Sequence, residues 1–127
     1  MMRMTRLLTI LALAILAPSG SGFAAQEYTI DASHSTVGFS IRHIVSRTTG
    51  KFNDVKGAIL YDAEDPTQST VNATISMASI DTDNERRDGH LKSADFFNVE
   101  KYPSMTFVSS SVTAKGNVLM VTGDLTM

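Results

Sequence analysis

A short charged segment, residues 83–97, brings together side chains whose types could do chemistry. Arg87, Asp88 and His90 follow closely on one another there. An arginine guanidinium presents a planar fork of donors that suits phosphate, so these side chains could meet a polar or phosphorylated head group. Arg87 and Asp88 could instead pair with the loop backbone and fasten the segment to the rest of the fold, because structural ion pairs are common. The residue types leave both interpretations open.

Other residues whose chemistry could matter do not form a recognisable site. His34, His43 and His90 lack the short spacing of known metal ligands, so we expect no metal. His43 continues the apolar face of a predicted strand, which favours a buried, hydrogen-bonded histidine, and it remains a further polar candidate. Ser35 and His34 are neighbours in an extended segment and point to opposite faces, so they make no catalytic triad. The sequence has no nucleophile elbow or glycine-rich phosphate loop. We expect a protein that is not an enzyme and needs no cofactor.

The elements on either side of the charged segment show the alternation of β-strands. Five strands are predicted, over residues 36–43, 55–61, 71–77, 105–112 and 118–127. Lys115-Gly116-Asn117 is a tight-turn signal between the last two. One face of these strands carries the apolar residues Val37, Phe39, Ile41, Val55, Ile59, Ile75, Met77, Met105 and Phe107. They could line a lumen or fill a core, and alternation does not separate the two.

The charged segment itself predicts a short helix. Thr82 and Glu85 have the spacing of a capping box, which marks a helix start, and Gly89 weakens the helix that follows. Asp95-Phe96-Phe97 and Tyr102-Pro103 indicate a loop pinned by aromatic side chains. Short strands, polar turns and one helical insertion favour an all-β fold, an antiparallel barrel or sandwich.

The N-terminal residues resemble a secretory signal peptide. Two arginines precede an apolar run, residues 7–17, and a break rich in small residues follows. We expect residues 1–24 to be removed by a cut between Ala24 and Ala25, leaving residues 25–127 as one domain. The apolar run is too short to anchor the protein by spanning a membrane. We expect no membrane span in the chain that remains after residues 1–24 are removed.

The composition of residues 25–127 limits the partners. Removing the two N-terminal arginines leaves nine basic and 13 acidic residues, a formal charge of −4. Nucleic acid is therefore not an expected partner, because binding phosphate backbones needs a basic face. The absence of cysteine means that an exported domain of this size must be stabilised by its core. A periplasmic or secreted bacterial location is the simplest expectation.

Six short motifs, in order, carry a resemblance to a known family. They are Tyr28-Thr29-Ile30-Asp31, the run from His34 to His43, Gly50-Lys51-Phe52, the run from Arg87 to Phe97, Tyr102-Pro103 with Phe107, and Gly123-Asp124-Leu125-Thr126. Together the motifs resemble the YceI family of periplasmic polyisoprenoid-binding proteins, over essentially all of residues 25–127. The resemblance implies a lipocalin-like antiparallel β-barrel whose apolar tunnel holds an isoprenoid lipid, such as a quinone tail or a prenyl phosphate.

The resemblance also sets further expectations. The sequence stops after Leu125-Thr126, where family members continue through strands that close the barrel, so we expect an incomplete, C-terminally truncated barrel. The open edge could then pair two copies into a homodimer. The expected function is binding and sequestration or transport of the isoprenoid. The alternative is a structural or stress-response module of the same fold that binds no lipid, with its lumen filled by side chains.

Overall fold

The structure, a computed structural model, describes residues 24–127. The predicted signal segment therefore lies outside the described residues, except for Ala24. The larger sheet has the order β1 (Gln26–Thr29), β4 (Val55–Tyr61), β5 (Thr70–Ser76), β7 (Ser104–Lys115) and β8 (Val118–Thr126). The smaller sheet has the order β2 (Val37–His43), β3 (Ser46–Phe52) and β6 (Ile80–Asp81). One α-helix, α1 (Glu85–Lys92), and two 3₁₀ turns, η1 (Pro66–Gln68) and η2 (Met77–Ser79), complete the described elements.

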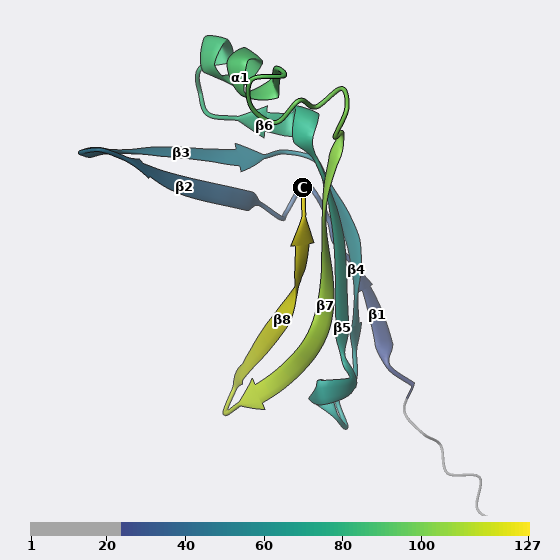
Figure 1. Cartoon of the computed structure of the whole chain (residues 1–127). Helices are drawn as coiled ribbons and strands as arrows, with labels where there is room; N and C mark the ends of the chain where they lie inside the picture. The colour runs from purple at the N-terminus through teal and green to yellow at the C-terminus, as the bar shows by residue number, and fades with distance from the viewer. Residues whose placement is uncertain (1–23) are drawn as a thin grey trace, which may run out of the picture.

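All strand pairs in the two sheets are antiparallel, so the predicted fold class, all-β with a short helical insertion, is confirmed. The larger sheet curves along its length, while the β2–β3 hairpin extends sideways from one end of it (Figure 1). Within residues 24–127 the sheets do not close into a barrel, and β1 and β8 are the edges of the larger sheet. The described part of the chain is therefore an open, barrel-like half-shell.

A two-residue corner, Asn53 and Asp54, carries the chain from the smaller sheet into the larger one. The backbone N–H of Asn53 donates to the carbonyl of Ser79 at 3.1 Å, and that of Asp54 donates to Ser79 Oγ at 3.1 Å. Ser76 N in turn donates to the Asp54 carbonyl at 2.9 Å. These bonds tie the corner to η2 and to β5, and they therefore fix how the two sheets meet.

The hydrophobic core lies where the smaller sheet packs on one end of the larger one. Its buried members are Phe52, Val55, Ile75, Met77, Ile80 and Met105, and the half-buried residues packed against them are Ile30, Val37, Phe39, Leu91, Phe97 and Val99. The register aligns Val55, Ile75 and Met105 across three strands. Cross-strand packing of this kind is the main way a sheet is stabilised, and here it also joins the two sheets.

The helix begins differently from the prediction. Asn84, not Thr82, is the N-cap of α1, and its side chain accepts from the backbone N–H of Arg87 at 2.9 Å. Thr82 is only 5% exposed, and its hydroxyl donates to Asp88 instead. The capping-box prediction was wrong because Asn84 caps the helix, while the hydroxyl of Thr82 is bonded to Asp88 inside the helix. The helix is short, as its glycine predicted.

Several local features differ from the sequence-based expectations. The strand predicted through Met77 ends at Ser76, and Met77 is buried in η2, with its N–H bonded to the Pro103 carbonyl at 3.0 Å. Only Phe97 of the predicted aromatic pins packs against the core, whereas Phe96 and Tyr102 are about half exposed. The last two predicted strands are present, and the turn between them contains Gly116 with a positive φ of 60°.

Candidate functional site

One face of the larger sheet, defined here as the inner face, is apolar across all five strands. The register places on it Tyr28, Val55, Ile59, Val71, Ala73, Ile75, Met105, Phe107, Val112, Leu119, Val121 and Leu125. The opposite face carries mainly Thr, Ser, Asn and charged residues, with Ala58, Leu60, Val108, Val118 and Met120 as apolar exceptions. An apolar face this wide must be covered by something if its residues are to leave water.

One end of the inner face is covered by the chain itself. Val55, Ile75 and Met105 are 2–7% exposed and contact the cluster that includes Phe52 and Met77. The smaller sheet and the segment around α1 lie over this end (Figure 1). These side chains fill a core and line no free space.

The other end of the inner face is open. On β8, Leu119 and Val121 are each 41% exposed and Leu125, which lies nearer the covered end, is 58% exposed, whereas Val112 opposite Val121 is only 3% exposed. Tyr28, on β1 at the opposite edge of the sheet, is 47% exposed. A depression of about 310 Å³ opens beside Tyr28 and Tyr61, which lie on this same face at the β1 edge. The exposed apolar residues of this face therefore lie along its two edge strands, β8 and β1, and they define the open region.

Glycine positions bring neighbouring strands close together on the inner face. A Cβ atom at Gly123 would lie 2.6 Å from the ring of Phe107 and closer still to the Val108 carbonyl oxygen. The Phe107 ring thus lies over the backbone of β8. A Cβ at Gly57 would collide with the Asn72 carbonyl oxygen. Larger residues at these two positions would need the backbone to move, so the curved packing depends on them.

The nine apolar residues predicted from sequence as tunnel lining fall into several groups. Val55, Ile75, Met77 and Met105 are buried in the core, Val37 and Phe39 pack against that core, and Ile59 and Phe107 are half-buried on the inner face. Ile41 lies apart on the β2–β3 hairpin and is 57% exposed. Only Ile59 and Phe107 therefore lie beside the open region. Sequence reasoning missed Tyr28, Leu119, Val121 and Leu125, which strand pairing places on the same face.

The polar candidates Arg87 and Asp88 both bind Thr82, the residue that follows β6. Asp88 Oδ1 accepts from the Thr82 backbone N–H at 3.0 Å and from its hydroxyl at 2.6 Å. Arg87 donates from Nε to Thr82 Oγ1 at 2.8 Å and from Nη2 to the Thr82 carbonyl at 2.6 Å. These are the contacts expected of residues that fasten α1 to the smaller sheet.

The remaining polar candidates are less constrained. His90 is exposed, with Nε2 3.5 Å from Asp95 Oδ2 and its ring edge-on to Phe96 at 4.8 Å. The side chain of His43 lies outside what the structure describes. Asn84, Arg86, Arg87 and His90 border a shallow surface depression of about 420 Å³, and no inner-face residue contributes to it.

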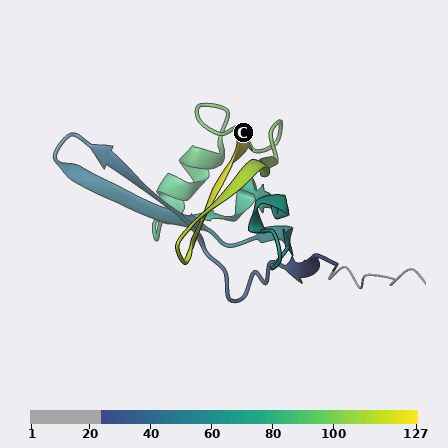
Figure 2. The same cartoon turned by 90° about the horizontal axis from the view of Figure 1, so that it is seen from below.

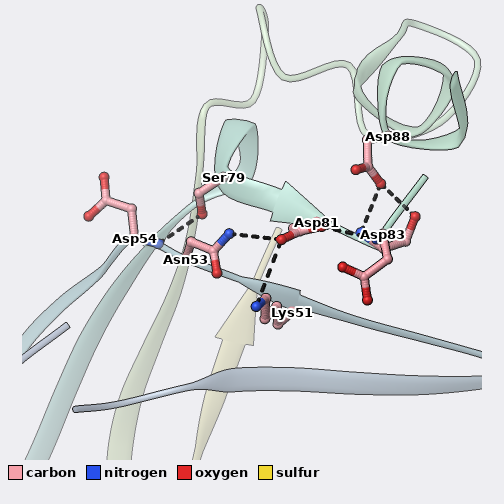
Figure 3. A network of polar contacts seen from close by, with 8 residues as sticks. Lys51, Asn53, Asp54, Ser79, Asp81, Asp83 and Asp88 are labelled. Carbon is pink, nitrogen blue, oxygen red and sulfur yellow. Dashed lines mark hydrogen bonds and ion pairs between the residues drawn. The ribbon is translucent and has the colours of Figure 1, made fainter. Parts of the chain in front are cut away.

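Asp81 is the centre of a second polar network next to the corner (Figure 3). Its carboxylate accepts from the backbone N–H of Asp83 at 3.0 Å and from Asn53 Nδ2 at 3.3 Å, and lies 3.8 Å from Lys51 Nζ. These contacts, the Asp83 N–H first, lower the pKa of Asp81 below its usual value. The network ties β3, β6 and the corner together.

Asp31, Ser33 and His34 are adjacent but do not form a catalytic triad. Ser33 Oγ lies 3.1 Å from His34 Nδ1, and Asp31 Oδ2 lies 2.7 Å from the same nitrogen. A triad places the serine and the acid on different ring nitrogens. The hydrogen bond from the Ser33 hydroxyl, followed by the His34 contact, lowers the pKa of Asp31. Among residues 24–127, no three His, Asp or Glu side chains come together as metal ligands.

The comparisons with known proteins agree with this architecture. The model of the YceI-like domain matches residues 28–127. The chain belongs to the YceI-like family. A UPF0312 protein of Photorhabdus laumondii is 43% identical over 124 residues, covering 95% of this chain and 64% of its own length. Protein YceI of Escherichia coli O157:H7 is 43% identical over 117 residues, covering 90% of this chain and 61% of its own.

Solved structures show the same fold. The crystal structure of Burkholderia cenocepacia BcnA matches 77% of this YceI-like chain with a TM-score of 0.71 and 29% identity, over 62% of its own length. The Campylobacter jejuni YCEI protein matches 80% with a TM-score of 0.61 and 38% identity, over 61% of its length. The chain thus spans less than two thirds of the curated relatives named here.

Proposed function

We propose that this YceI-like chain belongs to a bacterial envelope protein, periplasmic or secreted, that binds an isoprenoid lipid along the inner face of its larger sheet. The observation that carries the proposal is the open half of that face, where Leu119, Val121 and Leu125 remain exposed beside half-buried Phe107. An isoprenoid is a slender apolar chain, and the YceI resemblance implies such a ligand. Its methyl branches suit a surface of Leu, Val and aromatic side chains.

The energetics favour a lipid whose binding depends on contact area. Each Å² of apolar surface removed from water contributes roughly 25 cal/mol, so about 200 Å² of contact on this face contributes roughly 5 kcal/mol. No charged group lies among the inner-face residues, so the hydrocarbon part of the ligand provides the affinity. Arg87 and Asp88 are bonded to Thr82, and a head-group role for them is not needed for this binding.

The alternative, a fold module that binds no lipid, is favoured by the covered end of the inner face. There Val55, Ile75 and Met105 touch other side chains and leave no room for a ligand. The two proposals differ at the open end, where the first expects lipid against β8 and the second expects none.

The test is lipid extraction and mass spectrometry of protein recovered from a bacterial envelope, with two neighbouring substitutions on β8. Val121 lies on the inner face and Met120 on the outer face, and both are exposed. We expect isoprenoid to co-purify with the wild type and with M120D, and to be lost with V121D, because a carboxylate on the inner face would have to lose water when the lipid binds. Absence of isoprenoid from the wild type, or its retention by V121D, would contradict the proposal.

A further inference from the structure

The β2–β3 hairpin extends away from the rest of the fold in two views (Figures 1 and 2). Its strands pair from Val37↔Phe52 to His43↔Ser46, and the two-residue tip is Ile44-Val45. Ile44 is 84% exposed and Val45 is 98% exposed. Two β-branched apolar side chains are thus exposed to water at the tip of this hairpin.

The tip is held against local backbone preference. Ile44 has a φ of 53°, a left-handed conformation that is rare and costly for a β-branched residue. Two-residue hairpin tips strongly prefer glycine or asparagine at such positions. Local folding therefore does not explain Ile44-Val45, and strained backbone of this kind is typical of functional positions.

The hairpin is also basic in a chain that is acidic overall. The formal charge of the whole sequence is −2, yet residues 35–53 contain Arg42, Arg47 and Lys51 and no acid. Arg42 and Arg47 are directly opposite each other next to the tip, an arrangement that costs stability because like charges repel. In the described part of the chain, Lys51 forms an ion pair with Asp81, whereas neither of the two arginines has an acidic partner.

We propose that this hairpin tip docks on an anionic phospholipid surface. Ile44 and Val45 enter the interface between head groups and acyl chains, and Arg42 and Arg47 bind lipid phosphates with their guanidinium groups. Basic residues near an anionic leaflet are attracted to it, and the surface potential makes the two arginines additive. A protein partner is disfavoured because two side chains at a tip offer much less area than the roughly 800 Å² per partner of a stable protein interface.

The inference does not rest on isoprenoid binding, because docking concerns a different face and a different lipid. It adds the step by which a lipid-binding protein reaches the bilayer that holds its ligand. The hairpin extends away from the open end of the inner face, so Ile44 and Val45 can enter the bilayer without covering Leu119 or Val121.

Vesicle flotation tests the proposal with the full chain as recovered from a bacterial envelope. Vesicles of phosphatidylcholine alone are compared with vesicles that contain about 30 mol % phosphatidylglycerol, all free of isoprenoid. We expect flotation with the anionic vesicles, little with neutral ones, and a loss of binding at roughly 0.5 M salt. The I44G/V45S variant places glycine at the positive-φ position, so it keeps the hairpin while removing the apolar tip. We expect its partitioning to fall about tenfold or more.

Charge and apolar contributions are separated by matched variants. R42Q/R47Q is expected to lose about tenfold on anionic vesicles and nothing on neutral ones. K56Q/K115Q removes two exposed lysines elsewhere, and M120S removes an exposed apolar residue on β8; both should bind as the wild type does. Because every variant carries the same N-terminal segment, that segment does not affect the comparison.

Two results would overturn the proposal: no flotation of the wild type with anionic vesicles, or equal flotation of I44G/V45S. Unfolding midpoints of all variants are measured by circular dichroism, so that loss of the fold is not read as loss of docking. Isoprenoid recovery from I44G/V45S is expected to equal that of the wild type. Docking without any recovered isoprenoid would therefore contradict the proposed function and leave this inference standing.

Discussion

Replacing Arg87 by alanine tests whether this residue fastens α1 to the smaller sheet or binds a ligand. The guanidinium donates two hydrogen bonds to Thr82, at 2.8 and 2.6 Å, and the residue that receives them is 5% exposed. Hydrogen bonds to charged groups contribute roughly 1.5–3 kcal/mol each when sheltered. Arg87 is itself exposed, and ordering its long side chain costs about 2 kcal/mol, which leaves a net destabilisation of roughly 2 kcal/mol on truncation.

The matched control is Arg86→Ala, one position earlier in the same helix. Arg86 is exposed, and we expect its truncation to change the free energy of unfolding by less than about 0.5 kcal/mol. Urea unfolding followed by circular dichroism measures both variants. With a slope of roughly 1–3 kcal/mol per molar, the R87A midpoint should fall by about 1 M, whereas R86A stays near the wild type.

Equal midpoints for R87A and R86A would refute the fastening role. If R87A were as stable as the wild type yet lost its isoprenoid, Arg87 would instead be a head-group ligand. An R87A/T82V double variant adds a further check. Because both changes remove the bond between Arg87 Nε and Thr82 Oγ1, their combined effect should be smaller than the sum of the single effects.

Three further predictions concern the core, the polar network and the glycines. Ile75→Ala should cost about 2–5 kcal/mol of unfolding free energy because it leaves a cavity in the core, whereas Ile41→Ala, on the exposed hairpin, should cost under about 1 kcal/mol; urea unfolding compares them. The folded-state pKa of Asp81 is lowered, chiefly by a backbone N–H, so its stabilisation is present above about pH 4 and lost as the pH falls through the folded pKa; acid titration of D81N should lack this part of the transition. Gly89→Ala, with no atom within 4 Å of the new Cβ in a helix, should stabilise by roughly 0.5–1 kcal/mol, while Gly57→Ala, which collides with a carbonyl oxygen, should destabilise; thermal melts that show the opposite order would contradict the packing.

The sequence predicted the strands whose two faces differ, and it missed those whose faces are alike. β5 alternates between apolar and polar residues because one of its faces is covered and the other is wet. β4 alternates less strictly, since its outer face carries Ala58 and Leu60 besides Lys56. β3, with the sequence SRTTGKF, is polar and largely exposed, so its pairing with β2 leaves no period-two signal. β1 is short and exposed along its whole length, and β6 has only two residues.

The candidate site was only partly predictable because alternation does not tell which part of a face another element covers. Val55 and Ile59 lie on the same face of β4, yet the first is 2% exposed in the core and the second borders the open region. That difference arises from the corner at Asn53 and Asp54, which lays the smaller sheet over only one end.

A bulge in β7 sets a second limit on what alternation can predict. Strict alternation from Met105 and Phe107 would place Val112 on the outer face of the sheet. The irregular pairing between Ser109 and Ser111 shifts the register by one residue, so that Val112 lies opposite Val121 on the inner face. The strand pairing, and not the sequence pattern of β7, therefore decides which of its residues lie on the inner face, where Val112 is 3% exposed.

The covered end of the inner face blocks one end of the open region. A ligand that extends along β5 and β7 from the open side reaches Ile75 and Met105, which pack with Phe52 in the core. These two side chains cannot move without opening that core. Under the proposed function, the length of β7 and β8 between that covered end and the turn at Gly116 sets how many isoprenoid units the face can shelter at once.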